Sequence, residues 1–195
     1  MRRSAWVLLA STFLPTATAG EPVPPLPPLN ARVEAFTRSR LGRPVGDGIC
    51  ITLAVEALRE AGARGPSFDD PRGDYTWGDP VPSMKDALPG DILQFRDAIF
   101  QGKRSLGRGR WTTWHDEYPH HTAVVAKVSA DGKLVTIHHQ NVARDGQPED
   151  TRGNVQEGVL RMDSLQKGGW VKAYRPVPPD QPRPGSDIED AGPGR

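Results

Sequence analysis

Residues 120–142, HHTAVVAKVSADGKLVTIHHQNV, decide the fold expected for this chain. They hold four of its five histidines, and mostly apolar and β-branched residues separate the two His-His pairs. Asp131-Gly132 lies between the two apolar runs, and an Asp-Gly pair in this setting is typical of a hairpin turn. We therefore predict two antiparallel strands, at about 121–129 and 133–141.

The length of the turn decides which histidines share a face of this hairpin. Successive side chains of a strand point to opposite faces, so a slip of one residue exchanges the whole set. A two-residue loop at Asp131-Gly132 would place His138 and Gln140 on the face of His121. A three-residue loop, with Gly132 at positive φ and Ser129 opposite Lys133, would instead bring His139 and Asn141 to that face.

The second arrangement has a chemical use, because His121, His139 and Asn141 would then form one polar group. One imidazole could accept a proton from a nucleophile while a second polar side chain orients it. We therefore favour the three-residue turn, with His120 and His138 facing away from the site.

The single mature cysteine, Cys50, supplies a candidate nucleophile. Residues 47–63, DGICITLAVEALREAGA, carry apolar residues at helical spacing and end near Gly62, so they predict a helix capped by Asp47 or Gly48. Cys50 then lies in the first turn, where free backbone N–H groups and the helix dipole favour thiolate over thiol. A buried structural cysteine is the alternative reading of the same position.

The rest of the domain is predicted to contain helices first and strands afterwards. A helix is expected over 30–42, capped by Asn30. Residues 88–97 are expected to form a turn followed by a short strand at 92–95, and residues 169–177 a last strand. Residues 99–119 are expected to form a long loop or hairpin; the basic run 102–110 within them is interpreted as a solvated loop, with a patch for an anionic polymer as the alternative. This order indicates an α+β fold.

The two ends of the chain differ in composition from the middle. Residues 1–19 have two arginines, a short apolar core and the small-residue motif Ala17-Thr18-Ala19, which predicts a cleaved signal peptide and an exported, periplasmic or extracellular protein. Residues 20–30 are expected to be a Pro-rich linker, and 178–195 a disordered tail. One domain of ordinary size, 31–177, is left between them.

The charge balance bears on possible partners. The formal net charge is +1, and loss of Arg2 and Arg3 with the signal would change it to −1, so nucleic acid is not expected as a partner. No further segment is apolar enough to predict an integral membrane helix. We expect a monomer.

Metal binding is a second possible use of the histidines. No fixed-spacing motif such as HExxH occurs, and adjacent histidines on a strand point to opposite faces, so neither a metal nor another cofactor is expected. The possible ligands are His115, Asp116, Glu117, His120, His121, His138 and His139.

In order along the chain, these motifs resemble the CHAP domain (cysteine- and histidine-dependent amidohydrolase/peptidase), a relative of the NlpC-type papain-like peptidases. GDGICITLAVEAL (46–58) resembles its nucleophile helix, LPGDILQF (88–95) its Gly-Asp strand, and residues 121–141 its histidine strand and the strand after it. The resemblance implies a papain-like fold with N-terminal helices followed by an antiparallel sheet or half-barrel.

The same resemblance implies roles for individual residues. Cys50 would be the nucleophile and His121 the base, with His139 at the position of the usual Glu and Asn141 at that of the Asn. A histidine at the third position is closer to the NlpC-type pattern. The expected function is a thiol hydrolase, a cysteine peptidase or amidase, that cleaves amide bonds in peptidoglycan or another peptide substrate. The alternative is a non-catalytic cell-wall-binding or interaction module on the same fold.

Overall fold

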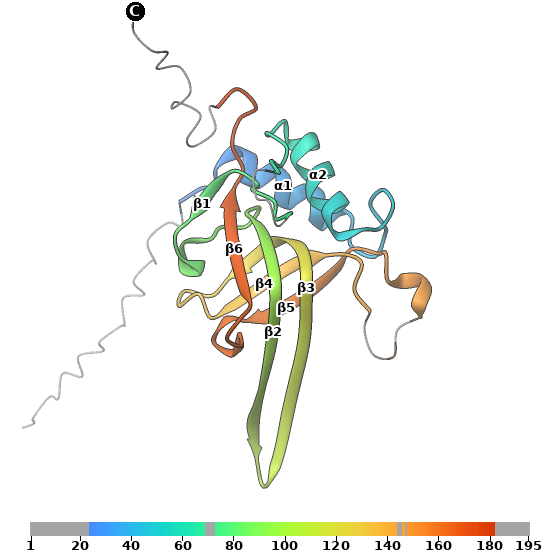
Figure 1. Ribbon diagram of the computed structural model, residues 1–195, viewed down its shortest axis with the longest axis vertical. Helices are drawn as coiled ribbons and strands as arrows, with labels where there is room; N and C mark the ends of the chain where they lie inside the picture. The colour runs from blue at the N-terminus through green and yellow to red at the C-terminus, as the bar shows by residue number, and fades with distance from the viewer. Residues whose placement is uncertain (1–23, 69–72, 144–145, 147, 182–195) are drawn as a thin grey trace, which may run out of the picture.

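The computed structural model describes residues 24–68, 73–143, 146 and 148–181, and the fold below concerns these residues (Figure 1). Two α-helices come first and an antiparallel sheet of six strands follows, in the order β1-β6-β2-β3-β4-β5. The expected α+β class is therefore confirmed. The predicted signal peptide, residues 1–19, and the tail beyond Gln181 lie outside the described residues.

The sheet is built from long central strands and short outer ones. All of its pairings are antiparallel. The strands are β1 (Asp79–Val81), β2 (Ile92–Gly107), β3 (Arg110–Val128), β4 (Leu134–His139), β5 (Gln156–Arg161) and β6 (Trp170–Arg175). Three 3₁₀ turns lie between them, at η1 (Met84–Asp86), η2 (Glu149–Thr151) and η3 (Met162–Ser164).

Helix α1 (Pro28–Ser39) begins two residues before its predicted cap, Asn30. The cap prediction is wrong: proline fits the first helical position, because its missing N–H would have no partner there. The Asn30 side chain is buried instead and donates to the Pro89 carbonyl and to Asp91 Oδ1, at 3.0 and 2.7 Å. Asn30 therefore connects α1 to the start of β2.

Helix α2 (Cys50–Ala61) ends as predicted, with Gly62 in the left-handed conformation at φ 67°. Its N-cap is Ile49, so the predicted caps Asp47 and Gly48 are wrong by one or two residues. Asp47 still serves this helix end, because its Oδ1 accepts from the Ile49 N–H and from the Thr52 hydroxyl, at 3.0 and 2.7 Å. Cys50 is the first helical residue, in the first turn as expected.

The two faces of the sheet bury separate apolar clusters. Val33 of α1 and Leu58 of α2 pack on one face against Ile92, Val124 and Tyr174. The cluster on the other face includes Ala173 of β6 and Leu160 of β5, although β2, β3 and β4 separate these strands in the sheet. This cluster therefore extends across the sheet from β6 to β5.

The LPGD stretch connects the helices to the sheet. Gly90 has φ 86°, and a Cβ there would lie 2.1 Å from the Asn30 carbonyl oxygen, so only glycine lets α1 approach. Asp91 is fully buried, and Arg175 of β6 binds it with an Nη2–Oδ2 distance of 3.0 Å. The motif thus fixes α1, β2 and β6 relative to one another.

The segment 99–119, whose path the sequence left open, belongs to the longest hairpin of the fold. β2 and β3 pair from Ile92 opposite Val124 to Gly107 opposite Arg110. The distal part of this hairpin projects well beyond the sheet as a two-stranded ribbon (Figure 1).

Candidate active site

Gln140 holds the loop that leads into the nucleophile helix. Its amide is fully buried; Oε1 accepts from the Val45 N–H at 3.1 Å, and Nε2 donates to the carbonyls of Val45 and Ile49, at 3.0 and 2.8 Å. The β4 end of the sheet therefore sets the position of Ile49, and with it that of Cys50. Gln140 entered the sequence reasoning only as a residue of the competing register, because nothing in its pattern indicates this contact.

Cys50 is a partly buried free thiol. Burial raises its pKa above the ordinary value and is the largest effect. Hydrogen bonds from the backbone of Thr122, Ile51 and Cys50 itself act in the opposite direction, and the charge of Asp47 adds to the rise. The expectation of a stabilised thiolate is therefore wrong for the resting site: the helix-start amides act as predicted, but burial outweighs them.

His121 lies on β3 with only 5% of its surface exposed. Its ring stacks on Tyr118 at a centroid distance of 5.0 Å and meets Phe95 edge-on at 5.5 Å. Burial, with a smaller effect from His120, lowers the pKa of His121 to about 4. His121 is thus a neutral imidazole at neutral pH.

A polar partner of this imidazole is His139 of β4, which is also buried. His121 Nε2 lies 3.2 Å from His139 Nδ1, and the rings meet edge-on. If the ring proton of His121 is on Nε2, it forms the hydrogen bond to His139 Nδ1. Nδ1 of His121 then has a free lone pair that can accept a proton from a nucleophile. Figure 1 shows β3 and β4, the strands that carry these rings, side by side.

The pairing of β3 with β4 that brings the two rings together differs from the one predicted from the sequence. Val124 lies opposite His138 and Val125 opposite Ile137, which is the favoured register, but nearer the turn Lys127 lies opposite Thr136. A bulge at Ala126 shifts the pairing between the two parts.

The turn itself is longer than predicted. Ser129 N–H donates to the Leu134 carbonyl, so the predicted pairing of Ser129 with Lys133 is wrong. Gly132 does have positive φ, at 70°, as expected.

Cys50, His121 and Asn141 line one cavity of about 410 Å³. No hydrogen bond joins the Cys50 thiol to His121 within the described part of the chain, so the cavity brings them together without a formed ion pair. Asn141 is exposed and has φ 63°, beyond the end of the β3–β4 ladder, and its side chain makes no hydrogen bond to a described residue. The remaining lining residues are His115–His120, Val142, Ala143 and Arg152.

A glycine makes room for the second histidine. A Cβ at Gly158 of β5 would lie 2.9 Å from His139 Nε2. Gly158 was not predicted as a site residue, because the only signal in the sequence was a glycine within a short polar strand.

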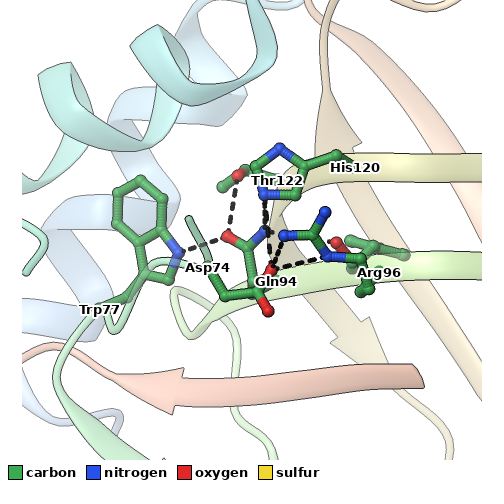
Figure 2. A network of polar contacts seen from close by, with 7 residues as sticks. Asp74, Trp77, Gln94, Arg96, His120 and Thr122 are labelled. Carbon is green, nitrogen blue, oxygen red and sulfur yellow. Dashed lines mark hydrogen bonds and ion pairs between the residues drawn. The ribbon is translucent and has the colours of Figure 1, made fainter. Parts of the chain in front are cut away.

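His120 points to the opposite face of β3, as expected, and joins the network of Figure 2. Trp77 Nε1 donates to Gln94 Oε1 at 3.0 Å, and an indole N–H can only donate. This bond orients the Gln94 amide, so Gln94 Nε2 faces Nε2 of His120 at 3.1 Å and His120 Nε2 accepts. His120 is thus bound to Gln94 and not to His139, although it lines the same cavity as Cys50 and His121.

An ion pair completes this network. Arg96 binds Asp74 through Nε and Nη2, at 2.9 and 2.5 Å, and Asp74 Oδ1 lies 3.6 Å from His120 Nε2. On the same side of the sheet, His138 Nδ1 lies 2.9 Å from the Thr37 hydroxyl of α1. Thr37 already donates to the Glu34 carbonyl, so it accepts from His138. His120 and His138 are therefore structural partners of the helix-side layer.

Two further possibilities can be assessed on the described residues. They include no group of three or more His, Cys, Asp or Glu side chains placed to hold a metal ion. Among the helices that the structure describes, none has both the length and the apolar character needed to span a bilayer.

A family model describes most of this chain. The AIM3/BBC1 cysteine proteinase-fold domain matches residues 29–182. The chain belongs to this family. Membership agrees with the papain-like fold expected from the sequence and with a cysteine at the start of a helix packed on the sheet.

The match is to a cysteine proteinase fold and does not identify the CHAP or NlpC-type family in particular. No match was found among curated proteins or among solved structures. The family is described by its fold and not by a reaction, so the activity has to be argued from the site.

Proposed function

We propose that the protein is a thiol hydrolase of amide bonds. The observation that carries the proposal is that His121, whose ring contacts His139, lines the same cavity as Cys50. A helix-start thiol and an imidazole that share a cavity, with a second imidazole bound to the first, are the parts that nucleophilic catalysis needs: a nucleophile, a base and a group that orients the base.

The proposed reaction starts from a neutral thiol and a neutral imidazole. Cys50 Sγ attacks the carbonyl carbon of the substrate while its proton moves to Nδ1 of His121, whose Nε2–H stays bound to His139 Nδ1. Backbone N–H groups at the start of α2 stabilise the oxyanion. The imidazolium then protonates the leaving amine, the C–N bond breaks, and water releases the acyl group from Cys50.

Two features support an exported protein that acts on peptidoglycan peptides. Residues 1–19 have the charge and apolar pattern of a cleaved signal, and the order of motifs resembles the CHAP domain. The substrate class rests on that resemblance, while the chemistry rests on the site.

The test is release of free amino groups from purified peptidoglycan, followed by mass spectrometry of the fragments. The unmodified chain should release them and Cys50→Ala should not. His120→Ala should retain most activity, because His120 lines the cavity but is bound to Gln94 and not to the His121–His139 pair. Retained release in Cys50→Ala would contradict the thiol mechanism. Release from a general peptide substrate but not from peptidoglycan would keep the chemistry and overturn the substrate class.

Two observations favour a second function: burial raises the pKa of Cys50, and no described hydrogen bond joins its thiol to His121. A non-catalytic binding module on the same fold would have these properties. Such a module would bind peptidoglycan without releasing amines, and Cys50→Ala would leave its binding unchanged.

A further inference from the structure

The distal part of the β2–β3 hairpin has an unusual charge for a near-neutral protein. We call residues 101–115, which pair from Gln101 opposite His115 to Gly107 opposite Arg110, the arm. The arm contains no Asp or Glu, whereas the whole chain has almost as many acids as bases. Its cations are Lys103, Arg104, Arg108 and Arg110, and no ion pair with another described residue engages them.

One side of the arm is fastened to the body of the domain. The Trp114 ring lies over Gly102, where a Cβ would be 2.2 Å from the ring. Trp114 Nε1 donates to Ser164 Oγ at 3.0 Å, and the Arg161 guanidinium lies 4.9 Å from the ring centroid. The arm therefore has a fixed inner side near its base, and its far end projects into solvent (Figure 1).

The far end carries exposed apolar side chains among its cations. Trp111 is 60% exposed and Leu106 is 49% exposed. Leu106 lies where the pairing of β2 and β3 is interrupted, between Ser105 and Gly107. The ammonium of Lys103 lies 5.5 Å from the Trp111 ring, so this tryptophan keeps a cation beside it.

We propose that the arm docks on the surface of an anionic lipid membrane. Basic side chains are attracted to anionic headgroups, and tryptophan concentrates at the boundary between headgroups and acyl chains. A polyanion such as nucleic acid could use the cations and stack on Trp111, but it offers nothing to Leu106. An acyl layer takes up both apolar side chains, which decides between the two occupants.

Docking at the tip would orient the candidate active site. The base of the arm continues into the cavity wall, because His115, Asp116 and Glu117 line the same cavity as Cys50. A membrane-bound arm would therefore hold the cavity at a fixed height above the lipid surface. This inference does not depend on hydrolysis, and Cys50→Ala should dock as well as the unmodified chain.

The experiment is co-sedimentation of the full chain with vesicles of phosphatidylcholine alone, or with about a third anionic phosphatidylglycerol, at moderate ionic strength. We expect binding to the anionic vesicles, weakened by added salt. Arg108→Glu should weaken it about tenfold or more, since it changes the local charge by two units. Leu106→Ser and Trp111→Ser should each weaken binding several-fold, with circular dichroism and melting temperature unchanged.

Matched controls lie elsewhere on the surface. Lys167→Glu makes the same charge change at an exposed position outside the arm, and Val159→Ser makes the same kind of polarity change at a residue that is 52% exposed. Both should bind like the unmodified chain. Quenching of tryptophan fluorescence by brominated acyl chains should occur and should be lost in Trp111→Phe.

Three results would overturn the proposal. Equal binding to both kinds of vesicle would remove the role of charge. Unchanged binding in the arm variants would place the contact elsewhere, for instance in the apolar N-terminal residues. Binding to a soluble polyanion that depends on Arg108 but not on Leu106, without binding to anionic vesicles, would make the arm a polyanion site.

Discussion

Gly158 faces the ring of His139 so closely that a methyl group in its place would lie 2.9 Å from Nε2. The same methyl would lie 3.3 Å from Ile137 Cγ1, so it would crowd a core side chain as well as the ring. Gly158 has an ordinary backbone conformation that alanine can adopt. The glycine therefore matters for the space that it leaves and not for backbone freedom.

Gly158→Ala should lower the hydrolysis rate by displacing the imidazole that orients the base. We expect kcat to fall about tenfold or more while KM changes little, because a misplaced base acts on the chemical step. The control is Gly65→Ala, at an exposed glycine with no atom within 4 Å of the added methyl. Equal activity in both variants would contradict the positioning role of His139.

The neighbouring histidines of β4 should separate activity from stability. His139→Ala should cut the rate by about 10²–10⁴ by removing the partner of His121 Nε2. His138→Ala should cut the rate little but lower the free energy of unfolding by about 1–3 kcal/mol, because it leaves a cavity and removes the hydrogen bond to Thr37. Steady-state kinetics measures the loss of rate in each variant, and urea unfolding measures the loss of stability. A reversal of the pattern would move the orienting role to His138.

Gln140 should influence the reactivity of Cys50 through its hydrogen bonds to Val45 and Ile49, in the segment that precedes the cysteine. Gln140→Glu keeps the acceptor for the Val45 N–H but faces the carbonyls of Val45 and Ile49 with an oxygen. We expect loss of about 1–3 kcal/mol of stability. The control is His138→Ala, which should lose a similar amount of stability. A lower rate of Cys50 alkylation in Gln140→Glu than in His138→Ala would show that the Gln140 amide positions the thiol. An unchanged alkylation rate would limit Gln140 to a structural role.

The helices and the site hairpin could be predicted from sequence because their signals are local. The apolar stripe of α2 and the alternation around Asp131-Gly132 each need only neighbouring residues. The register could not be derived in the same way. No local sequence signal marks the bulge at Ala126. The bulge allows His139 to lie beside His121 although the turn differs from the predicted one.

Two other regions gave too little signal to predict. In the arm most side chains are exposed, so no apolar alternation marks its strands. β5 buries only Leu160, and its sequence QEGVLR has no alternation of apolar and polar residues that would predict a strand. The prediction of a lowered thiol pKa was wrong for a different reason. The effects of a helix start can be predicted from position in the sequence, but the burial of Cys50 depends on the tertiary structure.

The pH dependence of Cys50 alkylation should show this burial directly. We expect the iodoacetamide rate to have a midpoint above the free-thiol value of about 8.5, because burial raises the Cys50 pKa. Unfolding in urea should return the midpoint to the ordinary value. His121→Ala should change it little, since no described hydrogen bond joins the two side chains. A midpoint below about 7 would indicate a preformed thiolate–imidazolium pair instead.

The burial of His121 should make the fold sensitive to mild acid. Its pKa is about 4 in the folded protein and near the ordinary 6.5 in the unfolded chain. Between these values the unfolded chain binds a proton that the native state does not, so stability falls as the pH drops from 6.5 towards 4 and is unaffected by this group above 6.5. The expected loss from His121 at pH 4 is about 3 kcal/mol.

Urea unfolding at pH 7 and pH 4 measures this loss. His121→Gln, which cannot titrate, should lose less stability between the two pH values than the unmodified chain does. The control is His115→Gln, which removes a histidine whose side chain is 56% exposed instead of a buried one. If His121→Gln keeps the full acid sensitivity, the unfavourable protonation lies at another buried group. His138 would be the first to test, because burial lowers its pKa as well.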